Sequence, residues 1–312
     1  MTQKNGKIPV NIVMGELGSG KTTVIMNLVR QIAGDQYRVI WLKNEYGDVN
    51  VDGALAKEAN ITTTEIMNGC LCCTAIGNLE TAMEQILEMK PDRVIIETAG
   101  TAHPAPIIME LKRFDNIVID SVVEVIDAIN FGGFGEPPVV RQSYNKYVDF
   151  AVVNKIGLVD ARRLEEVLDK VYEYYPDMPN IQTTDGSVPV EAIIGLDEGS
   201  AARHLSDEAL RKNMHEAEHR HMQAFSFRSS EEMVFSAEKI QVIIESLNKR
   251  DIWRAKGIIR TPNGWQVMNS VFSRVTWQPF TLANDRTEIL FVGPSAKEHE
   301  AETIEQLTRT GE

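Results

Sequence analysis

The chain has 312 residues, 43% of them hydrophobic, and a formal net charge of −13. This length allows about two domains at roughly 150 residues each. No apolar run approaches the ~20 residues of a membrane-spanning helix, and an acidic chain without a clustered basic face argues against a nucleic-acid partner. The polar start of the sequence has no secretory h-region, so we expect a cytoplasmic protein without a membrane partner.

Residues 15–23 read GELGSGKTT and match the pattern GxxxxGK[ST]. The apolar run at 9–14 suits a buried strand, and the helical spacing at 24–30 follows it, so the glycine loop joins a strand to a helix. Glycines let backbone N–H groups approach phosphate oxygens, and the helix N-terminus favours negative charge. We predict that a nucleotide binds here, at Gly15, Gly18, Ser19, Gly20, Lys21, Thr22 and Thr23.

The chemistry of this loop is assigned to a few side chains. Lys21 is predicted to reach the β- and γ-phosphates, and the Thr22 hydroxyl to help hold Mg²⁺. Further along, an apolar run ends in Glu97 and is followed three residues later by Gly100. Glu97 is predicted to approach Mg²⁺ or its waters, and the Gly100 N–H to bond the γ-phosphate. Alternatively, Glu97 is only a surface acid at a strand end.

Strands expected at 38–42, 63–67, 93–97, 116–127 and 150–155 alternate with helical segments. This alternation predicts βαβ units, and therefore an α/β P-loop NTPase with a mostly parallel sheet and its ligand at the carboxyl ends of the strands. Asn154 and Lys155 lie at such an end. We predict that they stack on and bond the nucleotide base.

All three cysteines of the chain lie within four positions, as CxCC. Thiolates suit Zn²⁺, Cu(I) and related ions, but three thiols cannot complete a tetrahedral site within one chain. A fourth ligand is expected from the acidic segment 44–53, which is also a candidate switch, or from His103, water or a partner. An incomplete site suits metal transfer; three buried cysteines or a redox cluster are the alternatives. The candidate protein ligands are Cys70, Cys72, Cys73, Glu45 and Asp48.

The chain is expected to divide into a nucleotide-binding domain at 1–200, a linker at 201–222 and a smaller α+β domain at 223–312. Periodicity weakens in the linker. There His215 and His219 are four residues apart, with His221 beyond them; this spacing can bind a metal but equally suits an exposed helix end. In the last domain, one helix at 236–249 and a mainly antiparallel sheet are predicted, with a hairpin turn at 262–264.

With these motifs the chain resembles the CobW family of P-loop GTPases, whose wider group includes the urease and hydrogenase nickel-insertion GTPases. The resemblance rests on GELGSGKTT at 15–23, NEYGDVNVDG at 44–53, NGCLCCT at 68–74, ETAG at 97–100 and RAKGII at 254–259. It implies GTP hydrolysis with Mg²⁺, and Zn²⁺ or Co²⁺ bound at the cysteines with help from Glu45 or Asp48. It further implies delivery of that metal to a client metalloprotein. The smaller domain is expected to recognise partners, and a homodimer is left open.

One departure from the family pattern concerns the nucleotide base. The guanine-reading motif NKxD is here Asn154-Lys155-Ile156-Gly157, and glycine has no carboxylate to accept guanine N–H groups. Guanine preference is therefore expected to be weak, or to depend on other residues, with Asp160 or residues 183–186 as candidates. Two other functions stay open: a metal storage or sensing module with a regulatory nucleotide site, and a P-loop small-molecule kinase. Turnover of GTP and a phosphorylated product distinguish them.

Overall fold

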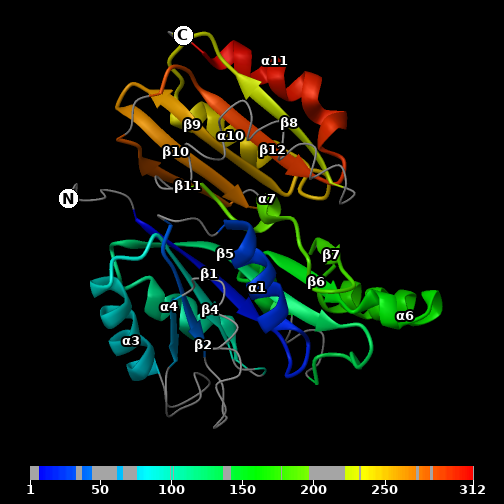
Figure 1. Ribbon diagram of the computed structural model, residues 1–312. Coiled ribbons are helices and arrows are strands. Elements are labelled where there is room, and N and C mark those ends of the chain that lie inside the picture. The colour runs from blue at the N-terminus through cyan, green and yellow to red at the C-terminus, as the bar shows by residue number, and fades with distance from the viewer. Residues whose placement is uncertain are drawn as a thin grey trace. The chain divides into compact units, whose positions relative to one another are not determined.

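The computed structural model divides into two compact units, Ile8–Val190 and a second made of Met1–Lys7 and Glu191–Glu312 (Figure 1). Each is described separately. The expected boundaries at 1–200, 201–222 and 223–312 remain predictions, because 197–221 lie outside the described residues. The structure describes residues 7–32, 37–43, 62–65, 76–98, 100, 102–135, 142–176, 178–196, 222–231, 233–271, 274–281 and 284–311.

The first unit contains a seven-stranded sheet of order β3-β2-β4-β1-β5-β6-β7, in which every pair of neighbours is parallel. The predicted parallel α/β fold is confirmed. Because neighbouring strands run the same way, their carboxyl ends share one edge of the sheet, which is where ligands bind in such folds. The strands are β1 (Ile8–Met14), β2 (Val39–Lys43), β3 (Thr62–Glu65), β4 (Arg93–Glu97), β5 (Ile117–Asp127), β6 (Phe150–Asn154) and β7 (Asn180–Gln182).

Helices cover both faces of this sheet. Val10, Ile12 and Ile96 face a core that also contains residues of α3, α4 and α6, while the alternate strand positions face the side of α1. Strands buried on both faces read as nearly continuous apolar runs, which is why the sequence showed them clearly. The helices are α1 (Lys21–Ile32), α3 (Ile76–Glu88), α4 (Pro104–Leu111) and α6 (Ala161–Tyr174), with the 3₁₀ turns η1 (Gln142–Lys146) and η2 (Ile156–Leu158).

A buried ion pair crosses the central strands. Arg93 on β4 is fully buried, and its Nη1 lies 2.5 Å from Asp120 Oδ2 and 2.6 Å from Asn11 Oδ1. Its Nε donates to the Tyr37 hydroxyl at 3.0 Å. The pairing of β1 with β5 shifts register between Val10 and Asn11, so an extra β5 residue, Asp120, is inserted there. Such a bulge re-aims a side chain, and here it brings the Asp120 carboxylate to the arginine.

The second unit is built on a five-stranded antiparallel sheet of order β11-β10-β9-β12-β8. Its core includes Phe225 and Phe291, whose rings stack with centroids 4.6 Å apart. The predicted α+β character is confirmed. Its elements are β8 (Gln223–Arg228), α10 (Ala237–Ser246), β9 (Arg254–Thr261), β10 (Gly264–Val271), β11 (Arg274–Pro279), β12 (Glu288–Gly293), η3 (Ala296–His299) and α11 (Glu300–Thr310); α7 (Val190–Ile193) stands where the two units meet in sequence.

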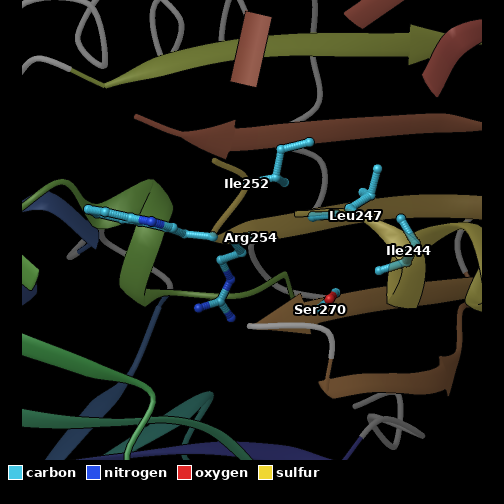
Figure 2. Close-up of a pocket in the computed structure, with 7 residues that line it drawn as sticks. Ile244, Leu247, Ile252, Arg254 and Ser270 are labelled. Atoms are coloured by element: carbon cyan, nitrogen blue, oxygen red, sulfur yellow. The ribbon is translucent and has the colours of Figure 1, made fainter. Parts of the chain in front are cut away.

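The RAKGII segment lies in β9, and its two basic residues have a structural use. Arg254 Nη1 donates to Ala192 O at 3.1 Å and to Ile193 O at 2.6 Å, and Lys256 Nζ lies 3.4 Å from Ile194 O. Both side chains are buried, so these bonds fix the segment around α7 to the antiparallel sheet. Arg254 also borders a small pocket (Figure 2), which is lined by Ile244, Leu247, Ile252, Trp253, Arg254, Ala255 and Ser270.

The element ends differ from the sequence expectations by at most three residues. The helix expected at 236–249 begins after an N-cap at Ser236, which accepts from Lys239 N, but ends at Ser246. It stops there because the Leu247 backbone is extended and Asn248 starts a turn that bonds Arg250 N and Asp251. In the described part of the chain, no helix is both long and apolar enough to cross a bilayer.

Candidate functional site

The glycine loop lies between the carboxyl end of β1 and the start of α1. Gly18 and Gly20 have φ values of +79° and +97°, which L side chains rarely adopt. Gly15 makes a close approach: a Cβ built on it would lie 2.2 Å from Val125 O of β5. The loop therefore has the tight, side-chain-free backbone that a phosphate cradle requires.

Lys21, the first residue of α1, folds back into this loop. Its Nζ donates to Gly15 O at 2.9 Å and to Glu16 O at 3.0 Å, and the residue is only 5% exposed. Beside it Ser19 is fully buried, and its Oγ has no hydrogen-bond partner among the described residues. A buried hydroxyl without a partner is costly, and a phosphate oxygen in the loop would give Ser19 an acceptor.

Thr22 and Glu97 meet on one side of the loop. Thr22 Oγ1 donates to Glu97 Oε1 at 3.1 Å, which links the start of α1 to the buried carboxyl end of β4. A hydroxyl beside a carboxylate is the oxygen donor set that suits Mg²⁺. Gly100, just beyond β4, leaves no room for a side chain, because a Cβ there would lie 2.9 Å from Leu17 N. The geometry thus brings together Lys21, Thr22, Glu97 and Gly100, whose catalytic roles remain predictions.

Asn154 and Lys155 contact the loop from the other side. Asn154 Nδ2 donates to Ser19 O at 3.0 Å, and Lys155 Nζ donates to Gly18 O at 2.6 Å. Lys155 has a positive φ of 66°, uncommon for a residue with a side chain. Their contacts therefore position the loop in this structure, and the predicted stacking on a base remains a prediction.

Asp127 at the end of β5 is a member of this site that the sequence reasoning missed. Its Oδ2 lies 2.9 Å from Lys155 Nζ. Burial favours the neutral acid, but hydrogen bonds from Lys155, Asn130 and the Ile129 N–H, with the Lys155 charge, outweigh burial and lower the pKa of Asp127 below its ordinary value. The signal was an acid ending an apolar strand next to the strand of Asn154, since adjacent parallel strands share one carboxyl edge.

The close fit of Gly20 gives a testable expectation. A Cβ on Gly20 would lie 2.2 Å from Asn154 Nδ2, whereas a Cβ on Gly18 would meet nothing within 4 Å. Both glycines have positive φ, so alanine strains the backbone at either position, but only Gly20→Ala must also displace the Asn154 amide from Ser19 O. We expect Gly20→Ala to weaken GTP binding at least about 10-fold more than Gly18→Ala. Titration calorimetry measures it, and equal losses would contradict this role of Asn154.

Asp160, a candidate for reading the base, and His103, a candidate metal ligand, both make helix-capping contacts in the structure. Asp160 is the N-cap of α6, and its Oδ1 accepts from Arg163 N at 2.8 Å. His103 is the N-cap of α4: its Nδ1 accepts from Ala105 N at 3.0 Å, and its ring lies 4.0 Å from that of Tyr144. Both side chains therefore stabilise helix starts.

The predicted transition-metal ligands Cys70, Cys72, Cys73, Glu45 and Asp48 all lie outside the described residues, as do His215, His219 and His221. Within the described ranges, no group of three or more His, Cys, Asp or Glu residues could hold a metal ion. The transition-metal site therefore remains a prediction from sequence.

Comparison with known proteins decides the family. The model of the CobW/HypB/UreG nucleotide-binding domain matches residues 9–182, which include the glycine loop, Glu97 and Asn154-Lys155. The chain belongs to the CobW/HypB/UreG family of P-loop GTPases. The resemblance inferred from the motifs is thereby confirmed.

Several curated CobW/HypB/UreG relatives align over much of the chain. A zinc chaperone CobW from a Sinorhizobium species is 34% identical over 248 residues, covering 69% of this chain and 68% of the relative. A zinc chaperone CobW from Pseudomonas aeruginosa is 28% identical, covering 82% of this chain and 78% of the relative. A zinc-regulated GTPase metalloprotein activator 1 from Schizosaccharomyces pombe is 28% identical, covering 61% of this chain and 49% of the relative.

Proposed function

We propose that this chain is a GTP-hydrolysing metallochaperone that binds zinc at its CxCC segment and delivers it to a client metalloprotein. The observation that carries the nucleotide half is the cradle itself, in which the buried Lys21 Nζ lies 2.9 Å from Gly15 O and Thr22 bonds Glu97. The zinc half is supported by three cysteines within four positions and by relatives named zinc chaperones. The names favour zinc over cobalt.

In the nucleotide half, the chain's own groups supply binding and charge stabilisation. The loop N–H groups and the N-terminus of α1 surround the phosphates. Lys21 exchanges its bonds to Gly15 O and Glu16 O for the β- and γ-phosphate oxygens, where it stabilises the charge that builds up as the γ-phosphoryl group leaves. Gly100 has no side chain to collide with the Leu17 backbone of the loop. It can therefore lie close to the loop and donate its N–H to the γ-phosphate.

The oxygen donors of Thr22 and Glu97 fit a magnesium ion. Thr22 would hold it directly and Glu97 through the carboxylate or a bound water, and the ion would neutralise charge on the β- and γ-phosphates. The Thr22–Glu97 hydrogen bond of 3.1 Å orients both side chains before any ligand binds. Preorientation lowers the cost of assembling the site.

In the metal half, Cys70, Cys72 and Cys73 are proposed to bind zinc as thiolates, with Glu45 or Asp48 completing the site. These residues lie in sequence between β2 and α3, on either side of the short strand β3. The segment with Glu45 and Asp48 follows β2, which neighbours β4, the strand of Glu97, and the cysteine segment follows β3, the next strand beyond β2. A change at the γ-phosphate can thus reach the metal ligands through neighbouring segments.

The zinc site is tested by metal analysis of protein purified without oxygen. We expect about one zinc per chain in the unmodified protein and a loss of most of it in Cys72→Ser, because three thiolates provide most of the four ligands that zinc normally takes. His299→Gln serves as control, since His299 pairs with Asp251 in the other unit. An unchanged zinc content in Cys72→Ser would contradict zinc binding at this segment.

A further inference from the structure

The order of the strands predicts where the nucleoside of a bound nucleotide would lie. On the β4 side of β1, Glu97 and Gly100 approach Thr22 and the loop, which marks the γ-phosphate end. On the opposite side come β5, β6 and then β7. A nucleotide with its triphosphate in the loop therefore extends its base over the carboxyl ends of β6 and β7, beside the Lys155 side chain and residues 183–186.

The turn after β6 and the turn after β7 are in contact. Ile156 N donates to Thr183 O at 3.2 Å, which joins the turn after β6 to the turn after β7. A Cβ built on Gly157 would lie 2.5 Å from Thr184 Cγ2 and 3.0 Å from its Oγ1. The Thr184 side chain thus occupies the space into which a side chain at 157 would project.

Two nearby carboxylates have bonding partners of their own. Asp160 Oδ1 caps α6, and Asp185 Oδ1 accepts from Ser187 N at 3.0 Å and from Thr183 Oγ1 at 3.3 Å. By contrast, the backbone N–H groups of Thr184 and Asp185 donate no hydrogen bond within the described part of the chain. The turn after β7 is held against α1, since a Cβ on Gly186 would lie 3.1 Å from Thr23 Cγ2.

From this geometry we infer that the chain reads a purine through its 6-oxo group, by backbone N–H groups of residues 184–185, and does not read the 2-amino group of guanine. The substrate class is then 6-oxopurine nucleoside triphosphates, with ITP accepted as well as GTP. ATP is disfavoured, because its 6-amino group presents hydrogen atoms to the same N–H donors. This inference rests on the nucleotide half of the proposed function and is independent of zinc.

Competition against a fluorescent GDP analogue, in zinc-free buffer, gives the affinities of GTP, ITP and ATP. We expect GTP and ITP to bind within about 3-fold of each other, and ATP at least about 10-fold more weakly. A preference for GTP over ITP above about 30-fold would overturn the inference. Because affinity is measured without zinc or client, a failure of zinc delivery does not alter this result.

A variant with a carboxylate introduced at position 157 allows a second measurement. Gly157 is outside the positive-φ region, so aspartate is conformationally allowed there once Thr184 is shortened. We expect Gly157→Asp with Thr184→Ala to favour GTP over ITP by at least about 10-fold, since a carboxylate accepts the 2-amino protons. Thr184→Ala alone is the matched control and should keep the two equal. If Asp185→Ala abolishes a GTP preference of the unmodified protein, Asp185 reads the amino group and the inference is wrong.

Discussion

Lys21→Ala is expected to lower kcat/KM for GTP hydrolysis by at least about 100-fold, in the range found when one preorganised charge-stabilising donor is removed. The Lys21 ammonium is 2.9 Å from Gly15 O and 3.0 Å from Glu16 O, inside the loop, and the residue is 5% exposed. The neighbouring Lys155 bonds Gly18 O and Asp127 instead. Lys155 therefore cannot replace Lys21 without giving up its own pair.

Phosphate release under single-turnover conditions measures this effect and separates chemistry from product release. Lys112→Ala is the matched control, because Lys112 is an exposed lysine at the end of α4, outside the site. Circular dichroism should show both variants folded. If Lys21→Ala keeps more than about a third of the hydrolysis rate, Lys21 is not a catalytic residue.

Asp120→Ala is expected to lower the free energy of unfolding by about 3–5 kcal/mol, the usual cost of leaving one member of a buried ion pair uncompensated. Arg93 is fully buried and has Asp120 Oδ2 at 2.5 Å. Its bonds to Asn11 and Tyr37 are to neutral groups, which do not offset its charge. Urea unfolding followed by circular dichroism measures the change.

Asp115→Ala is the control, since Asp115 is an exposed aspartate ahead of the same strand, and it should cost less than about 0.5 kcal/mol. A second variant separates the charge from the packing. Arg93→Met combined with Asp120→Leu should recover much of the loss, because apolar replacement of a whole buried pair is often nearly neutral. A cost below about 1 kcal/mol for Asp120→Ala would show that Arg93 is not stabilised by this carboxylate.

The sequence predicted the fold because its signals are local. Val10, Ile12 and Ile96 belong to apolar strands buried on both faces, and the loop at 15–23 has a fixed spacing. The Arg93–Asp120 pair was not predictable, since it depends on a one-residue shift in the register of β1 and β5. Such a shift arises from the tertiary pairing and leaves no periodic signature in the chain.

The site was predictable where a motif fixes both residue and role. Lys21, Thr22 and Glu97 are close together in the structure, as their motifs suggested. Asp127 was missed as a site residue, because its position depends on which strands become neighbours. Residues 183–186 are expected near the base from the sequence, but the approach of Thr184 to Gly157 depends on how two separate turns meet. Asp160 and His103 are helix N-caps, a use that becomes clear only once the helix start is placed, and their roles at the base and at the metal stay predictions.

The central claim is that the bound nucleotide changes the affinity of the chain for zinc. Zinc affinity measured with a nonhydrolysable GTP analogue and with GDP tests this directly. A chelator competition gives both values in the same buffer. We predict that they differ by at least about 10-fold, within the usual range of coupling between two sites, and that Lys21→Ala removes the difference. Equal zinc affinities with the two nucleotides would contradict the account.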